Sequence, residues 1–259
     1  MELADAHCHL LDPWFSDKEI TEVVKEASQN NVHVIINVGS NKEHYESVIV
    51  SANKFKQIYA NIGLQPTHAN DESLNSFKNF IFDNKKDIKA IGEVGLDYYW
   101  IKDSKQQKVQ RLIFKKIITY ANELNLPLVI HSRSAESDSI ELLEKFSNVP
   151  VLMHCFSGSF DNVKECIDLG YLISIPTSVK NRKKYRKIAK NVPLENMTLE
   201  TDAPFQSPFN GVNGEEPPKN EPKNILLSCQ KVAELLETTA EEVAKITTEN
   251  TKEFFSITY

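Results

Sequence analysis

The chain has 259 residues, of which 41% are hydrophobic and 25% are charged, so a globally disordered protein is excluded. The formal net charge of −6 excludes a surface coated in positive potential, and any contact with nucleic acid needs a local basic patch. No signal-peptide pattern opens the sequence, and no apolar run reaches the roughly 18 residues of a membrane span. We therefore expect a soluble cytoplasmic protein, with one domain over residues 1–259.

Eight short apolar or alternating runs are predicted to be strands. They span residues 3–6, 32–38, 58–62, 88–94, 128–131, 151–154, 171–175 and 197–200. Helical periodicity separates them at residues 17–30, 41–54, 71–84, 105–125, 136–146, 161–169 and 181–190, and two more helices follow at 223–237 and 240–247. This alternation predicts βα units and a parallel sheet, either a closed (β/α)₈ barrel or an open doubly wound sheet.

The segment between the eighth strand and the next helix is rich in turn-forming residues. Residues 204–222 hold five of the eleven prolines, together with Gly211 and Gly214. This composition predicts a long loop, and long loops often carry function.

Four of the seven histidines, His7, His9, His131 and His154, lie at the C-terminal ends of predicted strands. The i, i+2 spacing of His7 and His9 puts both imidazoles on one face of an extended segment, where they can share a cation. That pair alone fits two incidental histidines equally well. Scattered structural histidines would not all sort to strand ends, however, and barrel active sites are assembled there, so the closed barrel is favoured.

Two carboxylates complete the candidate set. Glu93 ends the fourth predicted strand, and Asp202 follows the eighth. A carboxylate in an apolar strand end is costly unless it is paired or bound to a cation, so a metal is the economical explanation. An ion pair with a basic residue such as Arg133 is the alternative.

Four imidazoles and two carboxylates exceed the needs of one tetrahedral site and predict two divalent metal ions. We expect His7, His9 and Asp202 around one ion, and His131 and His154 around the other, with Glu93 as the bridge. Glu93 and Asp202 are the predicted catalytic residues, and Asp202 is either a ligand or the general base. The ions would activate water and stabilise charge on a substrate oxygen. Mixed imidazole and carboxylate ligands suit zinc, manganese, cobalt or iron, whereas magnesium sites usually use oxygen ligands.

The four cysteines form no Cys-x-x-Cys pair, which indicates reduced thiols instead of a disulfide framework. Cys8 and Cys155 each follow a candidate ligand. Because neighbouring residues of a strand point to opposite faces, both thiols are expected to point away from the metals.

Several residues are candidates for substrate contact. Arg133 lies two residues after His131, where its guanidinium could hold a phosphate, although an ion pair is an alternative. A basic segment follows the seventh strand, and its start at Lys180 is best placed to contact a DNA backbone; solubility is the other explanation. The aromatic residues Tyr98, Tyr99, Trp100, Phe156 and Phe205 fit either base stacking or packing.

The sequence resembles the TatD family. The matching segments are Asp5-Ala6-His7-Cys8-His9-Leu10, Gly92-Glu93-Val94-Gly95-Leu96-Asp97-Tyr98, Leu126-Pro127-Leu128-Val129-Ile130-His131-Ser132-Arg133, His154-Cys155-Phe156-Ser157-Gly158-Ser159, Leu199-Glu200-Thr201-Asp202-Ala203-Pro204 and Asn220-Glu221-Pro222. They occur in the family's order across nearly the whole chain. The resemblance implies a metal-dependent hydrolase among the amidohydrolase-like barrels. It also implies deoxyribonuclease activity, often 3′ to 5′ on single-stranded DNA, with incision at damaged sites.

The sequence departs from the family at two points. The family commonly has Gly-x-His-Pro-His after the third strand, where this chain reads Gly63-Leu64-Gln65-Pro66-Thr67-His68, so the pocket wall and substrate preference differ. Lys219 stands before Asn-Glu-Pro where the family usually has arginine. Lysine keeps the charge for substrate binding but loses the bidentate fork.

Three functions are compatible with these residues. The first is a phosphodiesterase acting on DNA, the second a metal-dependent hydrolase of a small ester, amide or phosphate, and the third a non-catalytic nucleic-acid-binding protein. The third would most naturally lack a ligand, and none is missing. Arg133 and the basic segment favour phosphate over a neutral carbonyl substrate.

Overall fold

Eight parallel strands form one sheet in the order in which they occur in the chain, from β1 to β8. They are β1 (Leu3–Cys8), β2 (Val32–Gly39), β3 (Ile58–Ile62), β4 (Ile88–Asp97), β5 (Leu128–Arg133), β6 (Val151–Met153), β7 (Leu172–Pro176) and β8 (Met197–Glu200). The computed structural model describes residues 1–211 and 215–258, so Gly214 of the predicted loop lies outside the described residues.

The last strand returns to the first. Just beyond β8, the N–H of Asp202 donates to the carbonyl oxygen of His7 at 2.9 Å, and the N–H of His9 donates to the carbonyl oxygen of Ala203 at 2.7 Å. The sheet is thus a nearly closed (β/α)₈ barrel, and the open doubly wound alternative is excluded.

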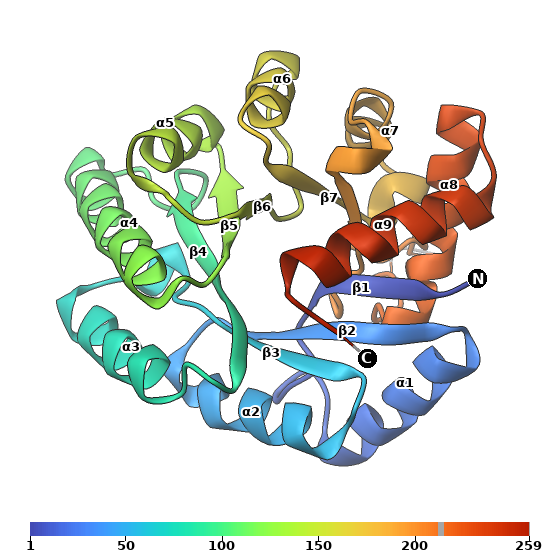
Figure 1. Cartoon of the computed structure of the whole chain (residues 1–259), viewed down its shortest axis with the longest axis horizontal. Helices are drawn as coiled ribbons and strands as arrows, with labels where there is room; N and C mark the ends of the chain where they lie inside the picture. The colour runs from blue at the N-terminus through green and yellow to red at the C-terminus, as the bar shows by residue number, and fades with distance from the viewer. Residues whose placement is uncertain (212–214, 259) are drawn as a thin grey trace.

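Helices surround the barrel as an outer ring (Figure 1). They are α1 (Asp17–Gln29), α2 (Tyr45–Lys54), α3 (Asp71–Asp83), α4 (Ser104–Leu124), α5 (Glu136–Phe146), α6 (Phe160–Asp168), α7 (Lys183–Ala189), α8 (Ile225–Leu236) and α9 (Ala240–Phe254). Short 3₁₀ helices connect some of them, at η1 (Lys42–His44), η2 (Pro66–His68), η3 (Thr177–Lys180), η4 (Leu194–Asn196) and η5 (Pro222–Asn224). None of the helices within the described residues is long and apolar enough to span a membrane.

The local sequence explains where helices begin. Ser16 caps α1 in a capping box, in which its side chain accepts from the backbone of Glu19 while the Glu19 carboxylate accepts from the backbone of Ser16. Asn70 caps α3 in the same way with Ser73. The apolar residues of each helix, such as Val23 and Val24 of α1, then turn towards the sheet and are buried.

A second core fills the barrel interior at the N-terminal ends of the strands. Small and branched residues there include Ala4, Ile36 and Ala90. The C-terminal segment closes this end, because Phe255 and Ile257 pack into the same cluster, and α9 lies across the barrel in front of the strands (Figure 1). This arrangement leaves the opposite end of the barrel for the site.

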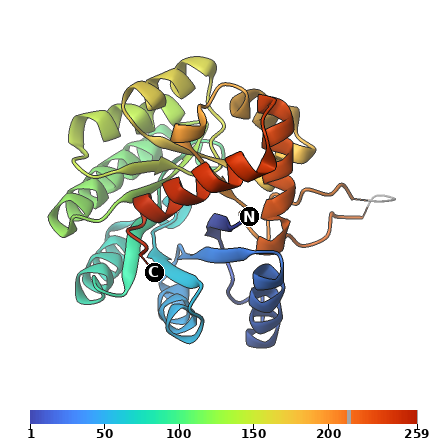
Figure 2. The ribbon, with the colours of Figure 1, turned by 45° about the vertical axis from the view of Figure 1, so that its right-hand side comes forward.

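The structure extends some predicted elements. β1 continues to Cys8 and β4 to Asp97, because the parallel pairing with the next strand continues past the apolar run. The described flanks of the segment after β8, up to residue 211 and from residue 215, reach beyond the helical ring (Figure 2). The predicted long loop is therefore present in the part of the chain that the structure describes.

Candidate metal centre

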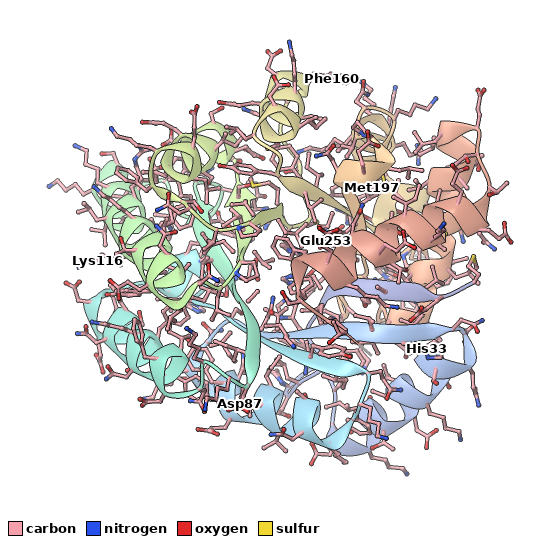
Figure 3. The ribbon with its side chains drawn as sticks, in the orientation of Figure 1. His33, Asp87, Lys116, Phe160, Met197 and Glu253 are labelled. Carbon is pink, nitrogen blue, oxygen red and sulfur yellow. The ribbon has the colours of Figure 1, made fainter. Side chains whose placement is uncertain are left out.

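A cavity of about 340 Å³ lies at the C-terminal ends of the strands. Its lining includes His9, Glu93, His131, His154, Asp202, Trp14, Ser40, Gln65, Ser132, Arg133, Cys155, Ser157, Tyr185, Phe205 and Gln206. His33, which was not a candidate ligand, lies at the start of β2, at the other end of the strand (Figure 3). His33 and the predicted ligands thus lie at opposite ends of the barrel.

The first and last strands bring three candidate ligands together. The Nε2 atoms of His7 and His9 lie 3.2 Å apart. Oδ1 of Asp202 lies 3.6 Å from Nε2 of His9 and 4.0 Å from Nε2 of His7. The backbone bonds that close the barrel between β1 and β8 therefore also hold this trio, in which His7 and His9 share a face as their i, i+2 spacing predicted.

Glu93 stands between two groups of histidines. Its Oε2 atom lies 3.9 Å from Nε2 of His9. Its Oε1 atom bonds Nδ1 of His131 and lies 3.9 Å from Nε2 of His154. A carboxylate whose two oxygens face different sets of imidazoles has the arrangement that a bridging ligand needs.

His154 lies closer to the first group than the predicted division into two metal sites implied. Its ring stacks on that of His7 with centroids 3.6 Å apart, and its Nε2 atom lies 3.9 Å from Oδ1 of Asp202. Among the described residues, three groups of three side chains have ligand atoms within 4.8 Å of one another: His7 with His154 and Asp202, His7 with His9 and Glu93, and His154 with Cys155 and Glu200. The six side chains thus form one continuous cluster.

Three imidazoles are held by the nitrogen that faces away from the cluster. Nδ1 of His9 lies 2.9 Å from the carbonyl oxygen of Val38, which can only accept, so Nδ1 carries the proton and Nε2 has a free lone pair. Nδ1 of His154 lies 2.8 Å from Glu200. This pattern, in which an outer acceptor fixes the tautomer, is that of metal-binding histidines.

His131 has the same arrangement with its nitrogens exchanged. Its Nε2 atom lies 3.0 Å from Oδ2 of Asp97, and its Nδ1 atom faces Glu93. His7 differs, because its Nδ1 atom is buried without a hydrogen-bond partner among the described residues.

Glycine allows β4 and β5 to approach at this point. Gly95 has φ +144°, and a Cβ atom there would lie 2.1 Å from the carbonyl oxygen of His131. Only glycine fits this approach, which places Glu93 and Asp97 on either side of the His131 ring.

Burial and neighbouring charges shift the pKa values in the cluster. Burial, together with the imidazoles of His154 and His9, holds the pKa of His7 well below its usual value. Burial also disfavours a charged His154, but Glu200, Asp202 and Glu93 outweigh it and raise the pKa of His154 to about 10. Burial, with smaller contributions from Glu200 and Glu93, raises the pKa of Asp202 to about 8.

These shifts describe a pocket that favours positive charge near its carboxylates. Burial opposes ionisation of Glu93, yet the imidazoles of His131, His154 and His7 hold its pKa well below the usual value. A divalent cation facing Nε2 of His154 would replace the proton there as the positive charge beside Glu93 and Asp202. The donor set and its burial therefore fit bound divalent ions.

The sequence prediction missed two buried carboxylates, Asp97 and Glu200, which lie behind His131 and His154. Their signal was spacing: Asp97 is four residues after Glu93, and Glu200 is two residues before Asp202. Residues at i, i+2 and i+4 of a strand share a face, so a longer predicted β4 would have included Asp97.

The prediction that Cys155 points away from the site is wrong. β6 ends at Met153, and Cys155 has φ +43°, so the alternation of a strand does not apply to it. Its thiol lines the cavity and lies 3.1 Å from the hydroxyl of Tyr185. Cys8 behaves as predicted, because its thiol donates to the carbonyl oxygen of Ile36, away from the cavity.

Arg133 is the only one of the three predicted substrate contacts that lines the cavity within the described residues. Its guanidinium lies over the ring of Tyr99, at 4.7 Å from the centroid, and over that of Trp100 at 5.9 Å. The alternative of an ion pair is not realised, since none of the ion pairs among the described residues includes Arg133.

The structure places Lys180 and Lys219 elsewhere. Lys180 lines a neighbouring groove and lies 5.0 Å from the centroid of the Phe209 ring. Lys219 donates to the carbonyl oxygen of Trp14 at 2.8 Å and to Glu19 at 2.9 Å, outside the cavity. The long lysine side chain reaches α1 instead of the cavity, so we leave Lys219 out of the proposed site.

The candidate aromatic residues divide between packing and exposure. Phe156 is fully buried, and the hydroxyl of Tyr98 donates to Asp138 at 2.7 Å. Tyr99, Trp100 and Phe205 remain exposed at the rim. The second group alone is available to a ligand.

The fold and the cluster together define a class of protein, a (β/α)₈ barrel with a buried histidine and carboxylate centre at the C-terminal ends of its strands. Comparison with known proteins gives the family. The family described as "TatD related DNase" matches residues 4–256. The chain belongs to this TatD family and is a metal-dependent hydrolase.

Relatives match over nearly their whole length. The chain is 36% identical to the uncharacterized metal-dependent hydrolase YabD of Bacillus subtilis, covering 98% of this chain and 99% of that protein. It is 32% identical to human deoxyribonuclease TATDN3, covering 98% and 94%. Among solved structures, the TatD homologue YjjV of Escherichia coli superposes with a TM-score of 0.87 at 27% identity, covering 99% of this chain and 98% of that one.

Proposed function

We propose that this hydrolase is a deoxyribonuclease that cleaves phosphodiester bonds with two divalent metal ions. The observation that carries the proposal is Arg133, an exposed cation that lines the metal cavity and has no carboxylate partner among the described residues. A free guanidinium beside a metal cluster suits an anionic phosphate better than a neutral amide or ester. The name of the human relative, deoxyribonuclease TATDN3, is consistent with this substrate.

The ligands divide around Glu93. We assign His7, His9 and Asp202 to one ion, and His131 and His154 to the other, with Glu93 as the bridge. Support comes from the two Glu93 oxygens, which face His9 on one side and His131 and His154 on the other. Mixed imidazole and carboxylate ligands suit zinc, manganese, cobalt or iron, with magnesium as a further candidate.

When bound, the ions would polarise the phosphate and acidify a water molecule. The protein's own groups then have separate tasks. Asp202 lies between His9 and His154 and can accept a proton from the attacking water in addition to acting as a ligand. Arg133 would hold a non-bridging phosphate oxygen, while Asp97 and Glu200 keep the tautomers of His131 and His154 fixed.

The preferred substrate is proposed to be single-stranded or damaged DNA, attacked from the 3′ end. A cavity of about 340 Å³ lined by buried histidines and carboxylates is expected to admit an unpaired strand end more readily than an intact duplex. The test is to incubate the metal-loaded protein with 5′-labelled single-stranded DNA and with chromogenic phosphodiesters, with and without chelator.

Each outcome identifies one function. Attack from the 3′ end gives a ladder of shortened labelled strands, whereas attack from the 5′ end releases labelled mononucleotide first. Hydrolysis of small esters without any cleavage of DNA would identify a small-molecule hydrolase. DNA binding without turnover of any substrate would identify a non-catalytic binding protein.

A further inference from the structure

Exposed aromatic side chains are concentrated in two segments that follow strands on the side of the barrel where the cavity lies. Six aromatic side chains among the described residues are more than a third exposed, and four of them lie in the two segments that follow β4 and β8. They are Tyr99, Trp100, Phe205 and Phe209. Exposing such rings to water is costly, so their concentration in these two segments, which border the cavity and the neighbouring groove, indicates a surface for a ligand.

Two aromatic walls border the cavity itself. The Arg133 wall consists of Arg133, Tyr99 and Trp100, in which the guanidinium covers both rings. The Phe205 wall consists of Phe205 and Trp14, whose ring centroids lie 5.3 Å apart. Arg133, Phe205 and Trp14 all line the cavity.

The walls lie on opposite sides of the centre. The Arg133 wall follows β4 and ends β5, whereas the Phe205 wall follows β1 and β8. In a ring of eight strands in sequential order, these positions are four strands apart. A phosphate at the cluster would therefore have an aromatic wall on each side.

The two walls also differ in charge. The Arg133 wall contains the cation of Arg133 and has a second cation beside it, since Nζ of Lys102 lies 5.2 Å from the centroid of the Tyr99 ring. On the Phe205 wall, Trp14 has two further ring neighbours beside Phe205, namely His9 at 5.8 Å and His44 at 6.0 Å between ring centroids. Flat unpaired bases stack on aromatic rings and on guanidinium planes, and cations there attract the adjoining phosphates.

We propose that the two walls are binding sites for unpaired nucleobases on either side of the scissile phosphate, with the base at the Arg133 wall held by stacking and charge. This inference rests on the proposed function, since it names the part of a DNA strand that the same cavity recognises. It predicts that recognition depends on the flat faces of the bases as well as on the phosphate.

The experiment compares oligothymidylate with the same strand carrying 5,6-dihydrothymidine at the two nucleotides around the cleaved bond. The saturated base keeps its polar groups and loses its flat aromatic face. For the wild-type protein, we expect KM to rise about 5- to 150-fold for each saturated base that loses its stack. Trp100→Ala and Phe205→Ala should raise KM for oligothymidylate similarly and have far less effect on the saturated strand.

The controls separate stacking from damage to the fold. Phe205→Tyr restores a ring and should restore KM, whereas Phe205→Leu keeps apolar volume without a ring and should not. Phe82→Ala removes an exposed ring with Lys78 over it, at the end of α3, and should leave KM unchanged. Metal content by elemental analysis verifies that each variant retains its centre.

Failure of this inference differs from failure of the proposed function. Equal KM values for both strands in a protein that cleaves DNA would overturn the aromatic walls alone. If the wild-type protein cleaves neither strand, the proposed function fails, and fluorescence anisotropy with the same metal-loaded protein and strands still tests the walls. Equal affinities in that assay would overturn them.

Discussion

Nε2 of His131 lies 3.0 Å from Oδ2 of Asp97, on the side of the imidazole opposite Glu93. Asp97 is 1% exposed, and its carboxylate also accepts a hydrogen bond from the backbone N–H of Trp100 at 2.8 Å. This second hydrogen bond fixes the orientation of the carboxylate relative to His131. The proton on Nε2 leaves Nδ1 free to face the centre. In the proposed centre, Asp97 would therefore act on the metal through His131.

Asp97→Asn should weaken metal binding without removing a ligand. An amide can present its NH₂ group to Nε2 and so favour the wrong tautomer, and loss of such an orienting group typically lowers metal affinity about 10- to 100-fold. Competition with a fluorescent chelator measures the affinity. Asp87→Asn, an exposed carboxylate just before β4 (Figure 3), is the matched control, and an equal loss in both variants would contradict the role of Asp97.

Glu93→Gln should have a larger effect on the centre than Asp97→Asn, because it removes the charge that we propose to bridge the two ions. We expect kcat to fall by more than the roughly 100-fold associated with groups that only orient ligands. Elemental analysis of the purified variant should show fewer ions per chain than the wild type. Full metal content with full activity would exclude Glu93 as the bridge.

Removal of the ions should lower the stability of the folded protein as well as its activity. Ions that bind only the folded chain add about 2.7 kcal/mol when their free concentration is 100 times Kd. Thermal unfolding with chelator should therefore give a lower Tm than unfolding with added ions, and adding ions back should restore both Tm and turnover. Identical melting curves in both conditions would show that the cluster does not bind the ions tested.

Lys219→Met tests whether Lys219 stabilises the fold through Glu19 instead of binding the substrate. Hydrogen bonds from Lys219, followed by those from Ser16, lower the pKa of Glu19 to about 2. A lowered carboxylate pKa contributes stability above the unfolded value of 4.5, and that stability is lost as the pH falls towards 2. NMR titration should show the Glu19 pKa rising in the variant, with KM for DNA unchanged.

Phe255→Ala should destabilise the barrel without touching the centre. Phe255 is fully buried in the interior cluster at the N-terminal ends of the strands. Removal of a buried phenylalanine side chain typically costs about 3–5 kcal/mol, which urea denaturation would measure. Phe82→Ala, at an exposed ring, should cost far less, and KM should stay unchanged in both variants.

The periodicity of the sequence was sufficient to predict the barrel because buried parallel strands are apolar over their whole length and their ends carry the polar residues. The same pattern placed five polar residues at or near strand ends, and the structure brings them together: His7, His9, Glu93, His154 and Asp202. The periodicity gives no information on the path of the backbone beyond the end of a strand. Cys155, with a positive φ, turns into the cavity, and this could not be deduced from alternation.

The predicted contact of Lys219 with the substrate failed for a different reason, because a long side chain can reach several places. Lys219 lies in the loop after β8, as expected, but its amino group donates a hydrogen bond to Glu19 of α1. The destination of a lysine depends on which carboxylate is near in space, and the sequence does not give that distance. Arg133 was easier to place, because it directly ends β5 beside a ligand.

The closure of the barrel through His7 and Asp202 has a consequence for the synthesis of the protein. A chain still emerging from the ribosome holds both histidines of β1 from the start but lacks its final carboxylate until almost four fifths of the polypeptide has been made. Incomplete translation products that end before β8 therefore cannot assemble the full set of ligands. The candidate metal centre is thus complete only once the circle of strands is complete.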